Sequence, residues 1–142
     1  GGLRSGTLSP ALCVGLGEAA RLMTQRRIND SSHVEALWTR ARALFDGWVL
    51  NGSASERYHG NLNLRRKGLD AARLMSDCRE VAFSLGSACA SGSGRPSHVL
   101  RALGLTDKQA RSSIRLGFGR YTTLDEMEPA AHWLNVAADK QG

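Results

Sequence analysis

The sequence predicts an α+β fold, in which helices pack on a small, mostly antiparallel sheet. Apolar residues repeat at helical spacing in the first and last thirds of the chain, and short segments of strand-forming residues lie between them. With 142 residues and 42% hydrophobic content, the chain is long enough to bury one core. We therefore expect a single domain over residues 1–142.

Two helices are expected in the first third of the chain. The first follows the turn at residues 4–7, begins near Pro10, which suits a first helical turn, and runs to about Leu22. The second starts at residues 29–32, whose Asn, Asp and Ser side chains are typical caps, and stops near Gly47. The apolar positions at helical spacing are Leu12, Leu16, Ala19, Ala20 and Met23 in the first helix, and Val34, Leu37, Trp38, Ala41, Leu44 and Phe45 in the second.

Strands are expected in the middle of the chain, because the apolar period changes after Gly47. The candidates, in order, are residues 48–50, 61–64, 80–85 and 113–118. The first ends at the Asn51-Gly52 turn, and the last alternates most clearly. Short helices are expected from Leu69 to about Met75 and from about Pro96.

The last segment is predicted to be a closing helix with a capping box at its start. Thr123 is the expected cap, and Glu126 stands three residues later. The apolar residues inside this helix are Leu124, Met127, Ala131, Leu134 and Val136.

Charge and cysteine content limit the classes of function. The net charge of +6 is compatible with anionic cofactors or acidic partners, but the basic residues are scattered and few aromatics lie among them, which argues against nucleic-acid binding. Three cysteines without a CxxC pair indicate a reducing, cytoplasmic location. No apolar run reaches transmembrane length, so we expect no membrane contact. The four histidines lack metal-ligand spacing, so no metal site is expected.

The segment most relevant to chemistry is residues 84–96. Its three glycines and small polar residues predict a loop with little to anchor it. Cys89 stands at the centre of this loop. A free cysteine with a structural role is normally buried, whereas an exposed one is reactive once its thiolate forms. We interpret Cys89 as a candidate nucleophile on a mobile loop. The alternative is a small filler residue at a strand end. Cys13 and Cys78 are expected to be fillers of this kind on their helical segments.

Several motifs carry a resemblance to a known family. They are Arg4-Ser5-Gly6-Thr7, Gly86-Ser87-Ala88-Cys89, Pro96-Ser97-His98-Val99-Leu100-Arg101-Ala102-Leu103-Gly104-Leu105, Ser112-Ser113-Ile114-Arg115-Leu116 and Gly119-Arg120-Tyr121-Thr122-Thr123. In this order and at these separations they resemble the cysteine desulfurases of the nitrogen-fixation and iron–sulfur-assembly type, within the class V aminotransferase family. The resemblance covers nearly the whole chain and implies the small C-terminal domain of a fold-type I pyridoxal phosphate enzyme.

The resemblance also implies roles for three residues. Cys89 falls on the cysteine that takes sulfur from L-cysteine and becomes a persulfide, with pyridoxal phosphate as the electron sink. Arg115 falls on the arginine that binds the substrate α-carboxylate, a task suited to its planar guanidinium. Thr7 falls on a threonine that reaches the cofactor phosphate of the neighbouring subunit, which implies a homodimer in the intact enzyme. The implied partners are L-cysteine, an N-terminal cofactor domain and a sulfur-acceptor or iron–sulfur scaffold protein.

The chain also departs from the family pattern. The family's cofactor lysine lies upstream of Arg-Ser-Gly-Thr, in a large α/β domain that has no counterpart in this sequence. We therefore expect a fragment, or one half of a split enzyme, that does not turn over alone. Two alternatives stay open: a non-catalytic persulfide carrier or assembly module, and a related selenocysteine lyase or aminotransferase.

Overall fold

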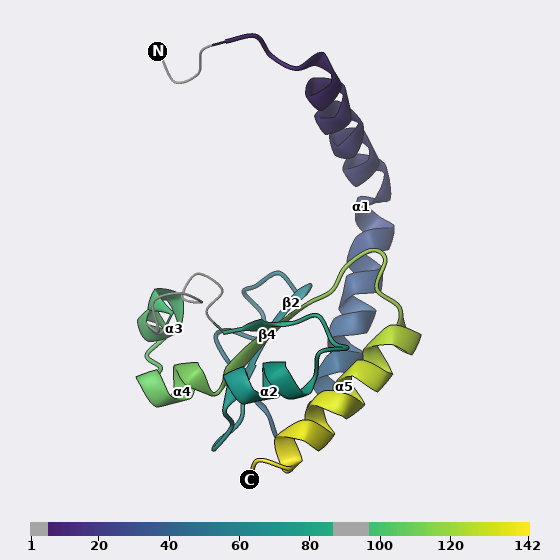
Figure 1. The fold of residues 1–142 in the computed structure, drawn as a ribbon. Coiled ribbons are helices and arrows are strands. Elements are labelled where there is room, and N and C mark those ends of the chain that lie inside the picture. The colour runs from purple at the N-terminus through teal and green to yellow at the C-terminus, as the bar shows by residue number, and fades with distance from the viewer. Residues whose placement is uncertain (1–5, 87–96) are drawn as a thin grey trace. The chain divides into compact units, whose positions relative to one another are not determined.

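The computed structural model describes residues 6–86 and 97–142 (Figure 1). The chain divides into two compact units, Gly1–Ser32 and His33–Gly142. All strands and every helix after the first belong to the second unit. Among the described helices, none combines the length and the apolar composition needed to cross a membrane.

The first third of the chain forms one helix, α1, Pro10–Leu44, and not the two predicted. The expected break at residues 29–32 was wrong. Polar side chains that favour caps are also tolerated inside a helix when they point to solvent. In addition, Arg26 and Asp30 form an ion pair of 3.8 Å one helical turn apart, which supports the helix at this point.

The apolar residues of the N-terminal unit are exposed. A single helix has no partner within its own unit on which to bury an apolar face. The large exposed side chains are Leu8, Leu12, Val14, Leu16, Met23 and Ile28. Cys13 is exposed as well, so the expectation that it fills space in a core was wrong for the described chain.

A four-stranded antiparallel sheet forms the centre of the second unit, in the order β1-β2-β4-β3. The strands are β1, Val49–Leu50, β2, Asn61–Arg65, β3, Ser84–Leu85, and β4, Ser113–Gly117. All four strand predictions are confirmed in position. The third strand is shorter than the predicted residues 80–85, because only its last two residues pair with β4.

One face of the sheet carries the hydrophobic core. Leu50, Leu64, Ile114 and Leu85 are successive cross-strand partners, so their side chains form one row on this face. Helix α5, Leu124–Asp139, and the part of α1 from His33 onward contribute to the same core (Figure 1). The buried helical residues include Leu37, Trp38, Ala41, Phe45, Met127, Ala131 and Leu134.

The predicted closing helix begins as the sequence indicated. Thr123 caps α5, and the capping box with Glu126 is complete. Met127, Ala131 and Leu134 are buried as expected, whereas Leu124 and Val136 are partly exposed because the helix turns them away from the sheet.

Three short helices complete the unit. Helix α2, Ala71–Asp77, is capped by Asp70, which accepts bonds from two backbone amides. Helix α3, His98–Ala102, is capped by Ser97. Helix α4, Asp107–Arg111, was not predicted, although the Thr106 and Gln109 side chains form a capping box that its sequence spacing indicates.

Leu134 provides a test of this core. Its side chain is fully buried between α5 and the sheet, so Leu134→Ala should lower the free energy of unfolding by about 2–5 kcal/mol. Urea unfolding measures the change. Leu124→Ala, at a position 46% exposed on the same helix, is the matched control and should cost far less. Equal losses in the two variants would contradict this packing.

Candidate functional site

The face of the sheet opposite the core carries polar side chains. Asn63, Arg115 and Ser84 are direct partners across β2, β4 and β3. Asn51 extends the row beyond β1, because its backbone amide donates to the carbonyl of Asn63 at 2.9 Å. Since side chains alternate along a strand, this polar row lies one residue away from the buried leucines.

Arg115 is the predicted substrate-binding residue, and it lies half-buried in this row. Its Nε donates to the Ser84 hydroxyl at 3.1 Å, which fixes the orientation of the guanidinium. Within residues 6–86 and 97–142, its Nη1 and Nη2 groups make no hydrogen bond and no carboxylate pairs with it. The guanidinium can therefore bind an incoming carboxylate through two parallel bonds.

A pocket of about 380 Å³ surrounds Arg115. It is lined by the segment that follows β1, the polar face of β2, Arg115 of β4, Gly86 after β3, and α3 with its two caps. The described lining residues are Asn51, Gly52, Ser53, Glu56, Arg57, Asn61, Asn63, Gly86, Ser97, His98, Val99, Leu100, Leu103 and Arg115.

The floor of this pocket is a buried hydrogen-bond network. Asn51 is only 3% exposed, and its Nδ2 donates to Asn63 Oδ1 at 2.7 Å and to Ser113 Oγ at 3.0 Å. Arg65 donates to Asn51 Oδ1. The Ser113 hydroxyl in turn donates to the carbonyl of Gln109 at 2.8 Å. Such a fully connected polar network favours a single, rigid arrangement of the floor.

Arg57 adds a second cation to the wall of the pocket. It donates to the carbonyls of Asn51, Ser53 and Asn61 at 2.7–3.2 Å, and its guanidinium lies 5.0 Å from the centre of the Trp38 ring. Burial, with the nearby positive charge of Arg42, lowers the pKa of Arg57. An arginine still remains charged at neutral pH, so the pocket holds two cations, and Glu56 is the one carboxylate among its described lining residues.

The two described residues that flank the segment with Cys89 line the same pocket. Cys89 itself lies in residues 87–96, outside the described residues. Gly86, before this segment, and Ser97, after it, both line the Arg115 pocket. Gly86 is also tightly packed, because a Cβ there would lie 2.7 Å from Ser113 Cβ. Its amide donates to the Ser113 carbonyl at 2.8 Å.

The other predicted residues have separate places. Thr7 belongs to the N-terminal unit, where it is exposed just before α1 begins at Pro10. Cys78 is buried after α2, as expected of a structural cysteine, and burial raises the pKa of its thiol. No group of His, Cys, Asp and Glu residues within the described ranges could hold a metal ion.

Asn51, Arg57 and Asn63 were missed by the sequence reasoning. Asn63 could have been found, because the alternation of its strand places it on the face opposite Leu62 and Leu64. Asn51 was recognised only as a turn residue. Arg57 gave no signal, since a single arginine in a polar loop is most often solvent-exposed.

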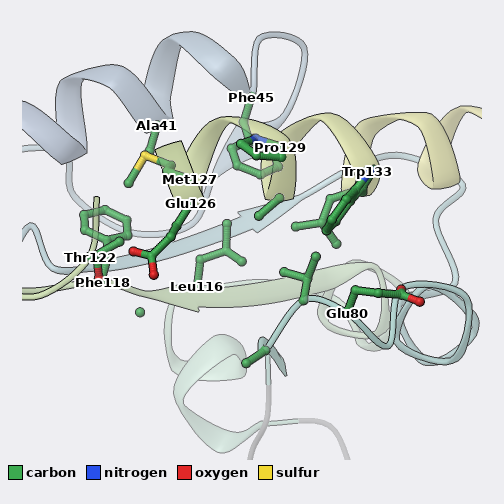
Figure 2. A pocket seen from close by; sticks show the side chains of 16 residues that line it. Ala41, Phe45, Glu80, Leu116, Phe118, Thr122, Glu126, Met127, Pro129 and Trp133 are labelled. Carbon is green, nitrogen blue, oxygen red and sulfur yellow. The ribbon is translucent and has the colours of Figure 1, made fainter. Parts of the chain in front are cut away.

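A second pocket, of about 530 Å³, lies on the core side between α5 and β4 (Figure 2). Its walls are mostly apolar, and Phe45, Leu116 and Trp133 are among the residues labelled there. Glu126 also lines it, but this carboxylate already accepts bonds from the backbone amide and the hydroxyl of Thr123. The described lining residues of this pocket include no lysine or arginine, in contrast to those of the Arg115 pocket.

Comparison with solved structures supports the fold. A NifS-like protein matches with a TM-score of 0.78 at 20% identity, over 98% of this chain and 35% of that one. DndA from Streptomyces lividans matches with a TM-score of 0.63 at 30% identity, over 82% of this chain and 34% of that one. The first of these, at its low identity, bears on the fold alone.

Sequence comparison gives named relatives. The cysteine desulfurase IscS of Colwellia psychrerythraea is 44% identical over 140 residues, which are 96% of this chain and 34% of the relative. The mitochondrial cysteine desulfurase of Saccharomyces cerevisiae is 45% identical over 130 residues, 89% of this chain and 26% of the relative. The chain therefore spans between about a quarter and a third of the length of these relatives. The family model for class-V aminotransferases matches residues 2–129, and the chain belongs to this family.

Proposed function

We propose that this chain is the C-terminal part of a pyridoxal-phosphate-dependent cysteine desulfurase. In this function Arg115 binds the α-carboxylate of L-cysteine and Cys89 accepts the sulfur. One observation carries the proposal: the guanidinium of Arg115 has no carboxylate partner among the described residues, and its pocket is lined by Gly86 and Ser97, the residues that flank positions 87–96. The likeness to relatives named cysteine desulfurase agrees with it.

The pocket around Arg115 suits a small carboxylate. Arg57 adds positive charge, and the bond from Arg115 Nε to Ser84 leaves the two Nη groups available. The network of Asn51, Asn63 and Ser113 holds the floor in place, so little conformational entropy is lost when an anion binds.

Cys89 supplies the nucleophile in the proposed reaction. Its thiolate attacks the sulfur of L-cysteine, and the carbon–sulfur bond breaks with its electron pair moving to carbon. A proton then completes alanine, and Cys89 carries the additional sulfur as a persulfide. The thiol sulfur of Cys89 is thereby oxidised and the substrate carbon is reduced, so the step needs no external oxidant.

Pyridoxal phosphate would supply an electron sink at the substrate carbon when bound. The described residues fit one part of this group, its phosphate. Thr7 is exposed three residues before the start of α1 at Pro10, and the first amides of a helix suit phosphate oxygens. By the family resemblance, Thr7 reaches the phosphate of the cofactor in the neighbouring subunit, so a homodimer is part of the proposal. An N-terminal domain that holds the cofactor lysine is part of it as well.

The persulfide on Cys89 would be passed to a sulfur acceptor or an iron–sulfur scaffold protein. The relatives named cysteine desulfurase include a bacterial IscS and a mitochondrial enzyme. A cytoplasmic location therefore stays a prediction.

Replacing Cys89 by serine tests the proposed chemistry. In the complete enzyme that contains this chain, Cys89→Ser should abolish sulfide release and leave the absorbance of the bound cofactor unchanged. Mass spectrometry of wild type treated with L-cysteine should find one extra sulfur on Cys89. Cys13→Ser, at an exposed cysteine, is the control and should keep full activity. Sulfide release by the Cys89→Ser enzyme would contradict the assignment.

Replacing Arg115 by lysine tests the carboxylate site. Lysine keeps the positive charge but cannot form two parallel bonds, so we expect KM for L-cysteine to rise about tenfold or more. Steady-state kinetics measure the change. Arg73→Lys, at an exposed arginine on α2, is the control and should leave KM unaltered. An unchanged KM in Arg115→Lys would exclude the proposed contact.

A further inference from the structure

The segment from Asn51 to Gly60 forms one wall of the Arg115 pocket. Its residues Asn51, Gly52, Ser53, Glu56 and Arg57 all line the cavity. This segment has no regular secondary structure, so its shape depends on side-chain contacts. Asn51 and Gly60 attach its two ends to the sheet and to Phe118. Between these ends, Arg57 and His59 make the side-chain contacts with Trp38 of α1.

His59 is held on three sides. Its ring stacks on Trp38 of α1, with ring centres 4.4 Å apart and an interplanar angle of 12°. Its Nδ1 lies 2.7 Å from the carboxylate of Glu35, one turn earlier on α1. Its Nε2 lies 3.0 Å from the carbonyl oxygen of Ala54, within the wall segment itself.

Both ring nitrogens of His59 therefore face hydrogen-bond acceptors. A neutral imidazole carries one N–H and can satisfy only one of them, whereas an imidazolium donates to both. Only the protonated ring can therefore donate to Glu35 and Ala54 at the same time.

The contacts continue from His59 to the pocket. Ala54 lies next to Ser53, and the carbonyls of Ser53 and Asn51 accept from Arg57 Nη1 at 3.2 and 3.0 Å. Arg57 also lies over the Trp38 ring on which His59 stacks. A change at His59 therefore reaches the wall both through the backbone at Ala54 and through the shared contact with Trp38.

We propose that His59, as an imidazolium bridging Glu35 and Ala54, is a positioning residue that holds this wall of the Arg115 pocket. Loss of its proton releases the wall and weakens binding of a carboxylate. This inference rests on the proposed function in one respect, namely that the pocket binds the carboxylate of the substrate.

The charges around His59 set the pH at which release occurs. The carboxylate of Glu35 and the carbonyl of Ala54 raise the pKa of His59 above its ordinary value of 6.5, while burial and the positive charge of Arg57 oppose them. Because the pKa is raised in the folded protein, the stabilising contribution is complete below 6.5. It is lost as the pH rises through the higher pKa of the folded state.

Two substitutions of His59 separate its charge from its shape. Glutamine removes the charge and the flat ring, whereas arginine can stack on Trp38, donate to both acceptors and stay charged at every pH used. His132→Gln is the matched control, because His132 is exposed on α5.

The first measurement is KM for L-cysteine in the complete enzyme with its cofactor. The ratio of KM between variant and wild type is used, because it cancels the titration of substrate and cofactor. For His59→Gln we expect a ratio of about two to five at about pH 6, the range of a partly exposed ion pair, and a ratio near one at about pH 9. His59→Arg should give a ratio near one at the lower pH and below one at the higher pH, with kcat unchanged in both variants.

A ratio for His59→Gln that is the same at both pH values would overturn the inference, since a purely structural role would produce it.

The second measurement does not depend on activity. Hydrogen exchange of the peptide that covers residues 51–60, corrected for intrinsic rates, should show lost protection in His59→Gln at the lower pH. His59→Arg and His132→Gln should keep the wild-type protection there. If Arg115→Lys leaves KM unchanged, the proposed function fails, and hydrogen exchange alone decides the role of His59. If His59→Gln keeps the wild-type protection at the lower pH, the proposal that His59 holds this wall is overturned.

Discussion

The register between β2 and β4 sets which side chains of the sheet face the core and which face the Arg115 pocket. Because Leu64 pairs with Ile114 and Asn63 pairs with Arg115, one face of the sheet is apolar and the other is polar. A slip of one residue would turn the polar row, with Arg115, into the core and expose the buried leucines. Burial of these leucines beneath α5 and α1 therefore holds Arg115 at its pocket, although none of them touches that pocket.

Much of this arrangement could be predicted from the sequence, because it depends on local patterns. Alternation in residues 113–118 predicted β4, and the spacing of Thr123 and Glu126 predicted the start of α5. The predicted break in α1 was wrong. Cap-forming side chains indicate where a helix can start, but they do not end a helix whose polar side chains point to solvent and form ion pairs such as Arg26–Asp30.

The candidate site was predicted less completely. The resemblance to a known family supplied Arg115, and the structure adds the residues around it. Arg57 and His59 act through contacts with Trp38, and Trp38 lies on a helix about twenty residues earlier in the chain. Neighbours of this kind are set by tertiary packing, and no local pattern in the sequence records them. The exposed leucines of the N-terminal unit have a similar origin, because their pattern predicts a buried face and the partner that would bury it is not part of this unit.

Gly86 and Ser97, the residues that flank positions 87–96, are each attached to regular secondary structure. Gly86 is bonded to the backbone of Ser113, and Ser97 caps α3 through the amide of Leu100. The first attachment is to the sheet, and the second is at the start of a helix. The length and composition of that stretch can thus diverge among descendants of one ancestor while the two attachment points, and with them the Arg115 pocket, are inherited unchanged. A single scaffold could in this way carry reactive segments of different reach, each matched to a different recipient.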